Sequence, residues 1–110
     1  MTVTEIIAKL ELEVIHLADG EREVSGAYTG DLLSWVMGKL SYGNVWITIM
    51  NNVNVIAVAT LADASCIILT EGSEIGYDVI AKAEACGVNI LRTAKSSYEI
   101  CCTLGKILNA

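Results

Sequence analysis

The stretch VWITIMNNVNVIAVATLADASCIILT, residues 45–70, decides the fold that we expect for this chain. Its two ends, VWITIM (45–50) and CIILT (66–70), are short apolar runs of the kind found in strands. Between them, NVIAVATLAD (54–63) is typical of a short helix. Continuous apolar strands that alternate with helices indicate βαβ units, in which a parallel sheet is buried on both faces. The stretch therefore predicts one such unit.

Three asparagines, Asn51, Asn52 and Asn54, lie in the middle of this apolar stretch. An Asn side chain is costly to bury unless its amide is hydrogen-bonded. The first backbone N–H groups of a helix have no partner within the helix, and Asn51 or Asn52 can cap them. Capping accounts for one or two of the three residues, so the remaining Asn is a candidate to face a ligand.

The flanking sequence continues the alternation of helices and strands. Two capping boxes, Thr2–Glu5 and Ser96–Glu99, mark helix starts, and Asp31 is a further candidate N-cap. Gly87 is placed to end a helix, and Asp19-Gly20 indicates a tight turn. The expected elements are helices at residues 4–10, 31–40, 77–86 and 97–108 and strands at residues 12–18, 21–28 and 88–93. The sequence predicts an α/β fold: a single domain, residues 1–110, with a mostly parallel central sheet built from βα units and helices on both faces.

Composition indicates a protein that associates with itself. The 110 residues suit one domain, and 54 % of them are hydrophobic, which is a high share. A domain of this size cannot bury so much apolar surface alone, so we expect a homodimer. The formal net charge of −6, with only 7 Lys and Arg residues, argues against a nucleic acid partner. No apolar run is long enough to span a membrane, so no membrane partner is expected.

The amino terminus and the cysteines bear on the cellular compartment. The start, MTVTEIIAKLELE, lacks the basic region and the cleavage site of a secretory signal. Cys66, Cys86, Cys101 and Cys102 form no CxxC pair, and with a single His the chain has no zinc pattern. We expect four reduced, mostly buried thiols in a cytoplasmic protein that needs neither a metal nor a cofactor.

Catalytic patterns do not emerge from the sequence. It contains no G-x-S-x-G nucleophile elbow, and no pair of carboxylates has a spacing that indicates acid–base work. His16 has no nucleophile beside it, so a surface or hydrogen-bonded role on a strand is the simpler interpretation. Cys101 and Cys102 fall inside the last expected helix, without a His nearby in sequence. We therefore expect that the chain is not an enzyme.

Polar residues recur where expected strands end and helices begin, and four of them are threonines. In a parallel sheet these strand ends share one edge, where helix N-termini offer free N–H groups and where ligands bind in open α/β folds. The alternative is that helix capping and the strand preference of Thr explain the pattern without a ligand. The candidate ligand-binding residues are Thr29, Asp31, Thr48, Asn51, Asn52, Asn54, Thr70, Glu71, Gly72, Thr93 and Ser96.

Two interpretations stay open for the aromatic residues near the second expected helix. Trp35, Tyr42 and Trp46, together with Met37, are suitable anchors for a protein interface. The same residue types are equally suitable for the core. The sequence does not decide between these interpretations.

Three stretches together resemble the DRTGG domain: GAYTGDLLSWVMG (26–38), residues 45–72 and AEACGVNILRTAKSSYEI (83–100). The family occurs as a regulatory insert in some CBS-domain pyrophosphatases and phosphotransacetylases, and a related domain forms the amino-terminal half of HPr kinase/phosphorylase. It also occurs as small stand-alone proteins, which this chain resembles most. The family's Asp-Arg pair falls near Asn52 and Val53, and its Thr-Gly-Gly falls on residues 70–72, of which only the first and last match. This chain thus departs from the signature at its charged positions.

The resemblance implies an α/β domain that pairs as a dimer and has a regulatory or scaffolding role. A serine kinase activity is not implied, because the kinase chemistry belongs to a separate P-loop domain and this chain has no G-x-x-x-x-G-K-[ST]. The leading hypothesis is a non-catalytic, dimeric regulatory module that binds a small ligand or a protein partner. The alternative is a nucleotide- or phosphate-binding sensor that uses strand ends and helix N-termini. A cysteine-dependent enzyme is the weakest hypothesis.

Overall fold

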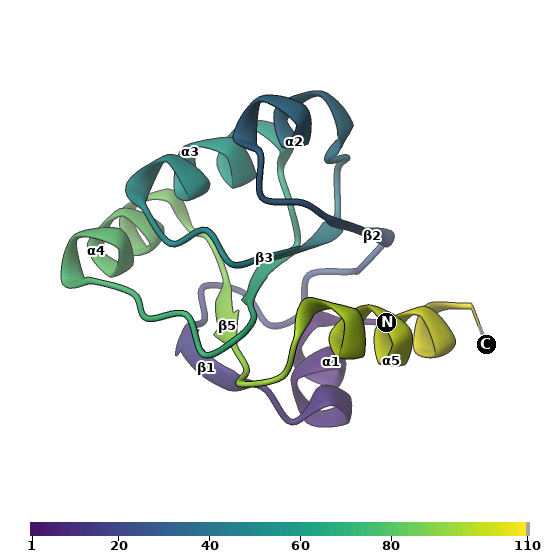
Figure 1. Ribbon diagram of the computed structural model, residues 1–110. Coiled ribbons are helices and arrows are strands. Elements are labelled where there is room, and N and C mark those ends of the chain that lie inside the picture. The colour runs from purple at the N-terminus through teal and green to yellow at the C-terminus, as the bar shows by residue number, and fades with distance from the viewer. Residues whose placement is uncertain (110) are drawn as a thin grey trace.

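The structure is a computed structural model that describes residues 1–109. At its centre is a five-stranded sheet in the order β1-β5-β4-β3-β2 (Figure 1). The strands are β1 (Glu13–His16), β2 (Gly26–Thr29), β3 (Asn44–Thr48), β4 (Cys66–Leu69) and β5 (Ile90–Arg92). β1 pairs with β5 in the antiparallel sense, and the other neighbouring strands are parallel. The predicted α/β fold with a mostly parallel sheet is confirmed.

Helices cover both faces of this sheet, as predicted. α2 (Leu33–Lys39), α3 (Val53–Ala62) and α4 (Tyr77–Cys86) lie on one face, and α1 (Val3–Leu10) and α5 (Ser97–Leu108) lie on the other (Figure 1). Within residues 1–109, no helix has the length and apolar character needed to cross a membrane.

The two central strands, β3 and β4, explain the apolar runs of the sequence. Trp46 pairs with Ile67 and packs in the core under α2, α3 and α4. Ile47 pairs with Ile68 and packs in the second core, under α1 and α5. Because successive side chains of a strand point to opposite faces, a strand covered on both faces must be apolar at every position.

Local sequence signals predicted several helix ends correctly. The hydroxyl of Thr2 accepts a hydrogen bond from the Glu5 N–H at 3.2 Å, and that of Ser96 accepts one from the Glu99 N–H at 3.1 Å. Both capping boxes are complete, because each Glu also accepts the N–H of its cap residue. Gly87 ends α4 with a φ of 70°, a left-handed conformation that glycine adopts without steric cost.

The strand predicted at residues 21–28 is partly wrong. β2 begins only at Gly26, and it lies at the opposite edge of the sheet from β1. The segment between them crosses the amino ends of the parallel strands and forms a single bridge, between Thr2 and Glu23. Strand pairing is set by which partner completes the buried face, and a turn signal at Asp19-Gly20 does not reveal that choice.

The thiols also differ from expectation. All four cysteines are free, but only Cys66 is buried; Cys101 is half-buried, and Cys86 and Cys102 are exposed. The prediction of mostly buried thiols is therefore wrong. Cys86 and Cys102 lie on the outward faces of α4 and α5, and an amphipathic helix buries only one of its faces.

Candidate functional site

The carboxyl ends of β2, β3, β4 and β5 meet along one edge of the sheet, as the sequence predicts. We call the loops that follow these strands the strand-end edge; they are residues 30–32, 49–52, 70–76 and 93–96. Two of the predicted hydroxyl groups, those of Thr48 and Thr70, are completely buried there. Buried hydroxyls need hydrogen-bond partners, so their contacts show how the edge is built.

Asp31 links the β2 loop to the β3 loop. Its Oδ1 accepts a hydrogen bond from the Thr48 hydroxyl at 2.7 Å and another from the Ile49 N–H at 2.9 Å. The Thr48 hydroxyl in turn accepts the Met50 N–H at 3.1 Å. The prediction that Asp31 caps α2 is wrong: the cap position is Leu32, which supplies no side-chain hydrogen bond. The carboxylate instead satisfies two donors at the end of β3, where an anion would otherwise be attracted.

Side chains also join the β3 loop to the β4 loop. Asn51 donates from Nδ2 to the Glu74 carbonyl at 2.5 Å. Ser73 donates from its hydroxyl to the Ile49 carbonyl at 2.9 Å. The sequence had singled out Asn51 but not Ser73, because a Ser four residues past a strand end carries no distinctive signal.

The β4 loop is joined to β5 and α5. The hydroxyls of Thr70 and Ser97 lie 2.7 Å apart, and the backbone N–H groups of Glu71 and Gly72 donate to the carbonyls of Lys95 and Thr93. Thr93 also accepts the Lys95 N–H through its hydroxyl. The four loops therefore form one continuous hydrogen-bonded set along the edge.

The three asparagines have three different roles, and all of them are exposed. Asn52 caps α3 by accepting the Asn54 N–H at 2.9 Å, which confirms the capping interpretation for this residue. Asn51 holds the neighbouring loop. Asn54 lies away from the strand-end edge, in a groove between α2 and α3.

Not every predicted residue belongs to the linked set. Thr29 donates its hydroxyl to the Ile47 carbonyl and lines a separate cavity of about 350 Å³ between β2 and α5. Ser96 is used in its capping box. Glu71 and Gly72 are exposed, and their side-chain positions face solvent. The structure thus brings Asp31, Thr48, Asn51, Thr70 and Thr93 into one network and leaves Thr29 and Asn54 outside it.

A groove of about 500 Å³ lies at the β5 end of this edge. It is lined by Glu13, Val14, Ile15, Ile75, Gly76, Tyr77, Ile80 and Arg92. The Arg92 guanidinium forms an ion pair with the Glu13 carboxylate at 2.8 Å. The Asp78 carboxylate, in the first turn of α4, lies where a side chain on the cap residue Gly76 would lie. The groove therefore combines an ion-paired arginine and an exposed tyrosine ring beside a helix start that already has a carboxylate next to it.

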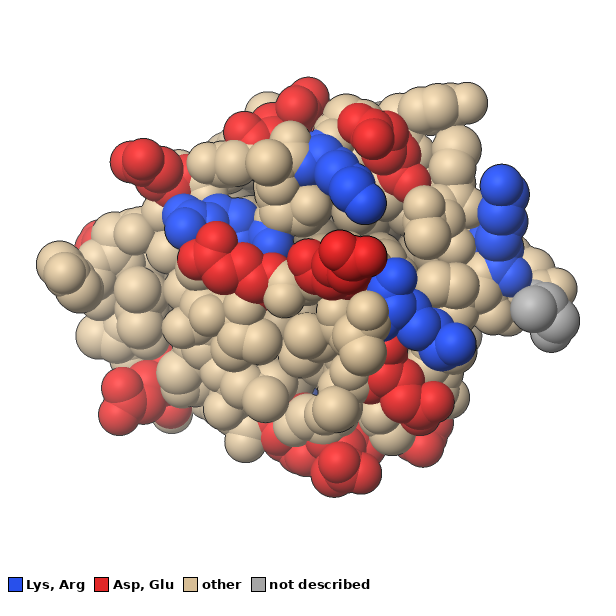
Figure 2. Space-filling view, turned by 90° about the horizontal axis from the view of Figure 1, so that it is seen from below, with Lys and Arg blue, Asp and Glu red and all other residues tan. Residues whose placement is uncertain are grey.

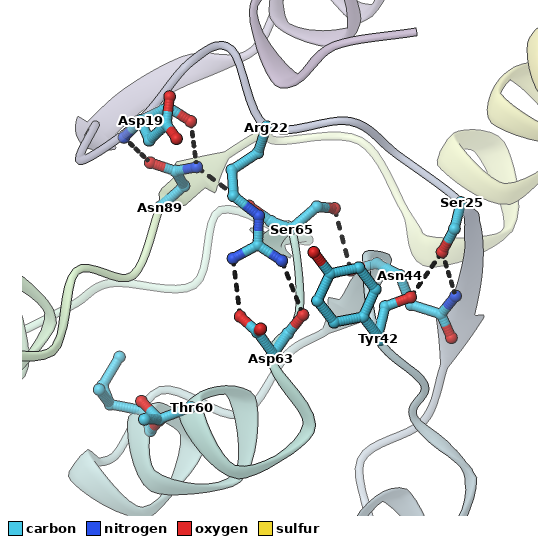
Figure 3. Close-up of polar contacts among 10 residues, drawn as sticks. Asp19, Arg22, Ser25, Tyr42, Asn44, Thr60, Asp63, Ser65 and Asn89 are labelled. Atoms are coloured by element: carbon cyan, nitrogen blue, oxygen red, sulfur yellow. Dashed lines mark hydrogen bonds and ion pairs between the residues drawn. The ribbon is translucent and has the colours of Figure 1, made fainter.

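A polar cluster that the sequence did not predict lies at the other end of the parallel strands, where β3, β4 and β5 begin (Figure 3). The buried Asn89 side chain contacts the backbone of Ala18, Asp19 and Ser65. Arg22 donates to the Asp63 carboxylate and carbonyl, both at 2.8 Å, and its guanidinium lies over the Tyr42 ring. In the sequence, the only sign of this cluster is the amide of Asn89 inside the apolar run VNILRT.

His16 belongs to the same end of the sheet. Its Nδ1 lies 3.0 Å from the Val88 carbonyl oxygen, which confirms the hydrogen-bonded interpretation of this residue.

The exposed Cys102 on α5 contacts the Tyr98 hydroxyl. A hydrogen bond with the Cys102 thiol raises the pKa of Tyr98. Within residues 1–109, no group of three or more His, Cys, Asp or Glu side chains could hold a metal ion.

Glu71 is a non-glycine residue with a φ of 59°, and Gly72, with a φ of 65°, follows it. A left-handed conformation costs a residue with a Cβ about 1 kcal/mol. We expect Glu71→Gly to raise the free energy of unfolding by about 1 kcal/mol, and the matched Gly72→Ala to lower it by about the same amount. Urea denaturation measures both changes. Equal stabilities of the two variants would contradict this assignment of strain.

Comparison with known proteins gives a consistent picture. The family model described as DRTGG domain matches residues 5–107. The comparison with curated proteins gave no match. Among solved structures, the chain is similar to the CBS and DRTGG domains of the regulatory region of Clostridium perfringens pyrophosphatase, complexed with the activator diadenosine tetraphosphate. The TM-score is 0.74 at 14% sequence identity, over 94% of this chain and 45% of that chain. This chain thus spans less than half the length of that regulatory region.

Proposed function

This chain belongs to the DRTGG domain family, and from that premise we propose that it is a non-catalytic regulatory module that pairs as a homodimer and binds a small ligand or a protein partner. We take residues 1–110 as a single domain of this family. The observation that carries the proposal is the linked strand-end edge. A ligand that displaces one loop there must also move the next, because neighbouring loops share hydrogen bonds.

The family signature supports the same edge as the binding region. Its Thr-Gly-Gly falls on residues 70–72, and its Asp-Arg pair falls near Asn52 and Val53, on the adjacent loop. Glu71 keeps the left-handed backbone that a glycine would adopt at that position. The loop shape is therefore retained although the glycine is not.

A non-catalytic role is supported by the state of the polar groups. The buried hydroxyls at the edge all have partners within the chain, and His16 lies at the opposite edge of the sheet. The Asp31 carboxylate is within hydrogen-bond reach of the Thr48 hydroxyl, but that hydroxyl is fully buried and does not face a substrate. The four free thiols are consistent with the cytoplasmic location that we propose.

The groove beside Arg92 favours a second candidate, a sensor of nucleotides or acyl phosphates. Arg92 supplies a guanidinium, and the exposed Tyr77 ring offers a surface on which a base can stack. The structurally similar regulatory region was complexed with a dinucleotide activator. Arg92 is ion-paired with Glu13, so a phosphate bound in the groove must replace that carboxylate.

A thermal-shift series tests this candidate with AMP, ATP, diadenosine tetraphosphate and acetyl phosphate. A ligand present at 100 times its Kd stabilises the fold by about 2.7 kcal/mol, a shift on the order of 10 °C for a domain of this size. We expect Arg92→Ala to weaken binding at least about tenfold, since a charge-assisted hydrogen bond contributes about 1.5–3 kcal/mol. Lys106→Ala, which removes an exposed cation from α5, is the matched control and should leave binding unchanged.

The outcomes separate the two candidates. Absence of a shift with all four compounds would remove the nucleotide and acyl phosphate sensor. A shift that Arg92→Ala leaves intact would move the ligand away from the groove. Capture of a specific partner by the wild-type chain, lost on mutation of Thr70 or Ser97, would support the protein-binding form of the module.

A further inference from the structure

The outer surface of α2 and α3 is apolar although it is exposed to solvent. We call it the α2–α3 face and define it by its exposed apolar residues, Leu32, Trp35, Met37, Val53, Ala57 and Leu61. Trp35 is 61 % exposed and Leu61 is 73 % exposed. The structure thereby separates the two tryptophans that the sequence could not assign, because Trp46 is fully buried in the core.

The composition of the two helices makes this exposure unusual. α3 contains no charged residue, and α2 contains only Lys39. A helix that is apolar on every side is normally buried on every side. α3 packs Val55, Ile56 and Ala59 into the core and leaves Val53 and Leu61 uncovered. The uncovered side therefore has the character of an interface.

The size of the α2–α3 face fits an interface between proteins. Its exposed apolar side chains present on the order of 600 Å², at the upper end of the patches that monomers expose. Each partner of a standard protein interface contributes about 800 Å², so this face supplies most of what a stable dimer needs.

We propose that a second copy of this chain covers the α2–α3 face; this inference rests on the proposed homodimer and names its interface. The chain carries a net charge of −6, so two copies repel each other wherever carboxylates meet. On the face seen from below, over α1 and α5, Lys, Arg, Asp and Glu side chains lie in a band across the middle and around the rim (Figure 2). The α2–α3 face has Lys39 as its sole charged side chain on the two helices, so two copies can meet there without opposed carboxylates.

The shape of the face is also suited to pairing with itself. A groove of about 310 Å³ between the helices is lined by Leu33, Met37, Asn54, Ala57, Val58 and Leu61. Trp35 is exposed on the same helix as Met37 but does not line this groove. A two-fold interface uses one surface patch on both subunits, so an exposed ring and a groove on the same patch allow each copy to fill the groove of the other.

Sedimentation velocity from 1 to 100 µM tests the inference with three variants of exposed residues. We expect the wild type to be a dimer, and Trp35→Ser and Leu61→Glu to raise the dimer Kd at least about 100-fold while the circular dichroism spectrum stays unchanged. Tyr98→Ser is the matched control, because it removes an aromatic ring that is even more exposed than Trp35 from α5 on the other face, and it should remain dimeric. A dimer that persists in both Trp35→Ser and Leu61→Glu would overturn the assigned face and leave the homodimer standing.

Iodide quenching of tryptophan fluorescence gives an independent readout. In the dimer, Trp35 should be shielded from iodide, and dilution into the monomer range should expose it. Trp46 is buried in both states, so the Trp35→Ser variant should show no quenching at any concentration. A wild-type dimer in which iodide quenches Trp35 as strongly as it does in the monomer would overturn the inference. A wild type that remains monomeric at 100 µM would overturn it together with the proposed homodimer.

Discussion

Replacing Asn89 with alanine is expected to lower the free energy of unfolding by about 3 kcal/mol, because the variant leaves several buried backbone groups without partners. The Asn89 side chain is 3 % exposed and uses all four of its hydrogen-bonding sites. Its Oδ1 accepts the N–H groups of Ala18 and Asp19 at 2.7 and 2.9 Å, and its Nδ2 donates to the carbonyls of Asp19 and Ser65 at 2.8 and 3.0 Å. One residue thus fastens the β1–β2 connection to the amino ends of β4 and β5 (Figure 3).

Asn89→Asp separates the contribution of hydrogen bonding from that of packing. The carboxylate has the same shape and can still accept from Ala18 and Asp19, but it faces the carbonyls of Asp19 and Ser65 without a proton to donate. We expect this variant to be destabilised at least as much as Asn89→Ala at pH 7, because an ionised group beside buried carbonyls is unfavourable. The destabilisation should diminish at pH 4, where the carboxyl carries a proton more often.

Urea denaturation monitored by circular dichroism gives these free energies. Asn54→Ala is the matched control, since its side chain is exposed and makes no hydrogen bond in the linked edge; its effect should stay within about 0.5 kcal/mol. A loss of less than about 1 kcal/mol for Asn89→Ala would contradict the role assigned to this amide.

The parts of the fold that follow from local chemistry were predictable from sequence. Capping boxes at Thr2 and Ser96 and the left-handed Gly87 act within a few residues, so they mark helix ends directly. The apolar runs of β3 and β4 likewise reveal burial on both faces. Pairing of β1 with β5 could not be predicted, because it joins segments more than 70 residues apart and leaves no local mark.

In the candidate site, too, the features set by local sequence were predictable and those set by long-range contacts were not. The order of the strand ends follows from the βα alternation, so Thr48, Thr70 and Thr93 were expected on one edge. The role of Asp31 was not, because a helix cap and a bridge to Thr48 require the same residue type at the same place in the sequence. Ser73 and Ser97, which complete the links between loops, gain their roles only from the three-dimensional proximity of those loops.

Alkaline pH is expected to destabilise the protein through Cys66. This thiol is fully buried in the core under α1 and α5, and burial raises its pKa from the ordinary value of 9.0 to about 12, against smaller opposing effects of Ser65 and Arg22. The folded state therefore keeps the proton at a pH where the unfolded chain has released it. This contribution to stability is complete below pH 9 and decreases as the pH rises from 9 towards 12. The slope is about 1.4 kcal/mol per pH unit, and the full loss is about 4 kcal/mol.

A comparison with two variants isolates this effect from the titration of other groups. Cys66→Ala loses some packing at every pH, but its free energy of unfolding should fall less steeply above pH 9 than that of the wild type. Cys86→Ser removes an exposed thiol and should keep the wild-type slope. Urea denaturation at pH 8.5, 9.5 and 10.5 measures the three profiles. Parallel profiles for wild type and Cys66→Ala would show that Cys66 ionises as readily in the folded state as in the unfolded one. Fast alkylation of all four thiols in the native protein would lead to the same conclusion, since only a thiolate reacts and a buried thiol with a raised pKa forms it rarely.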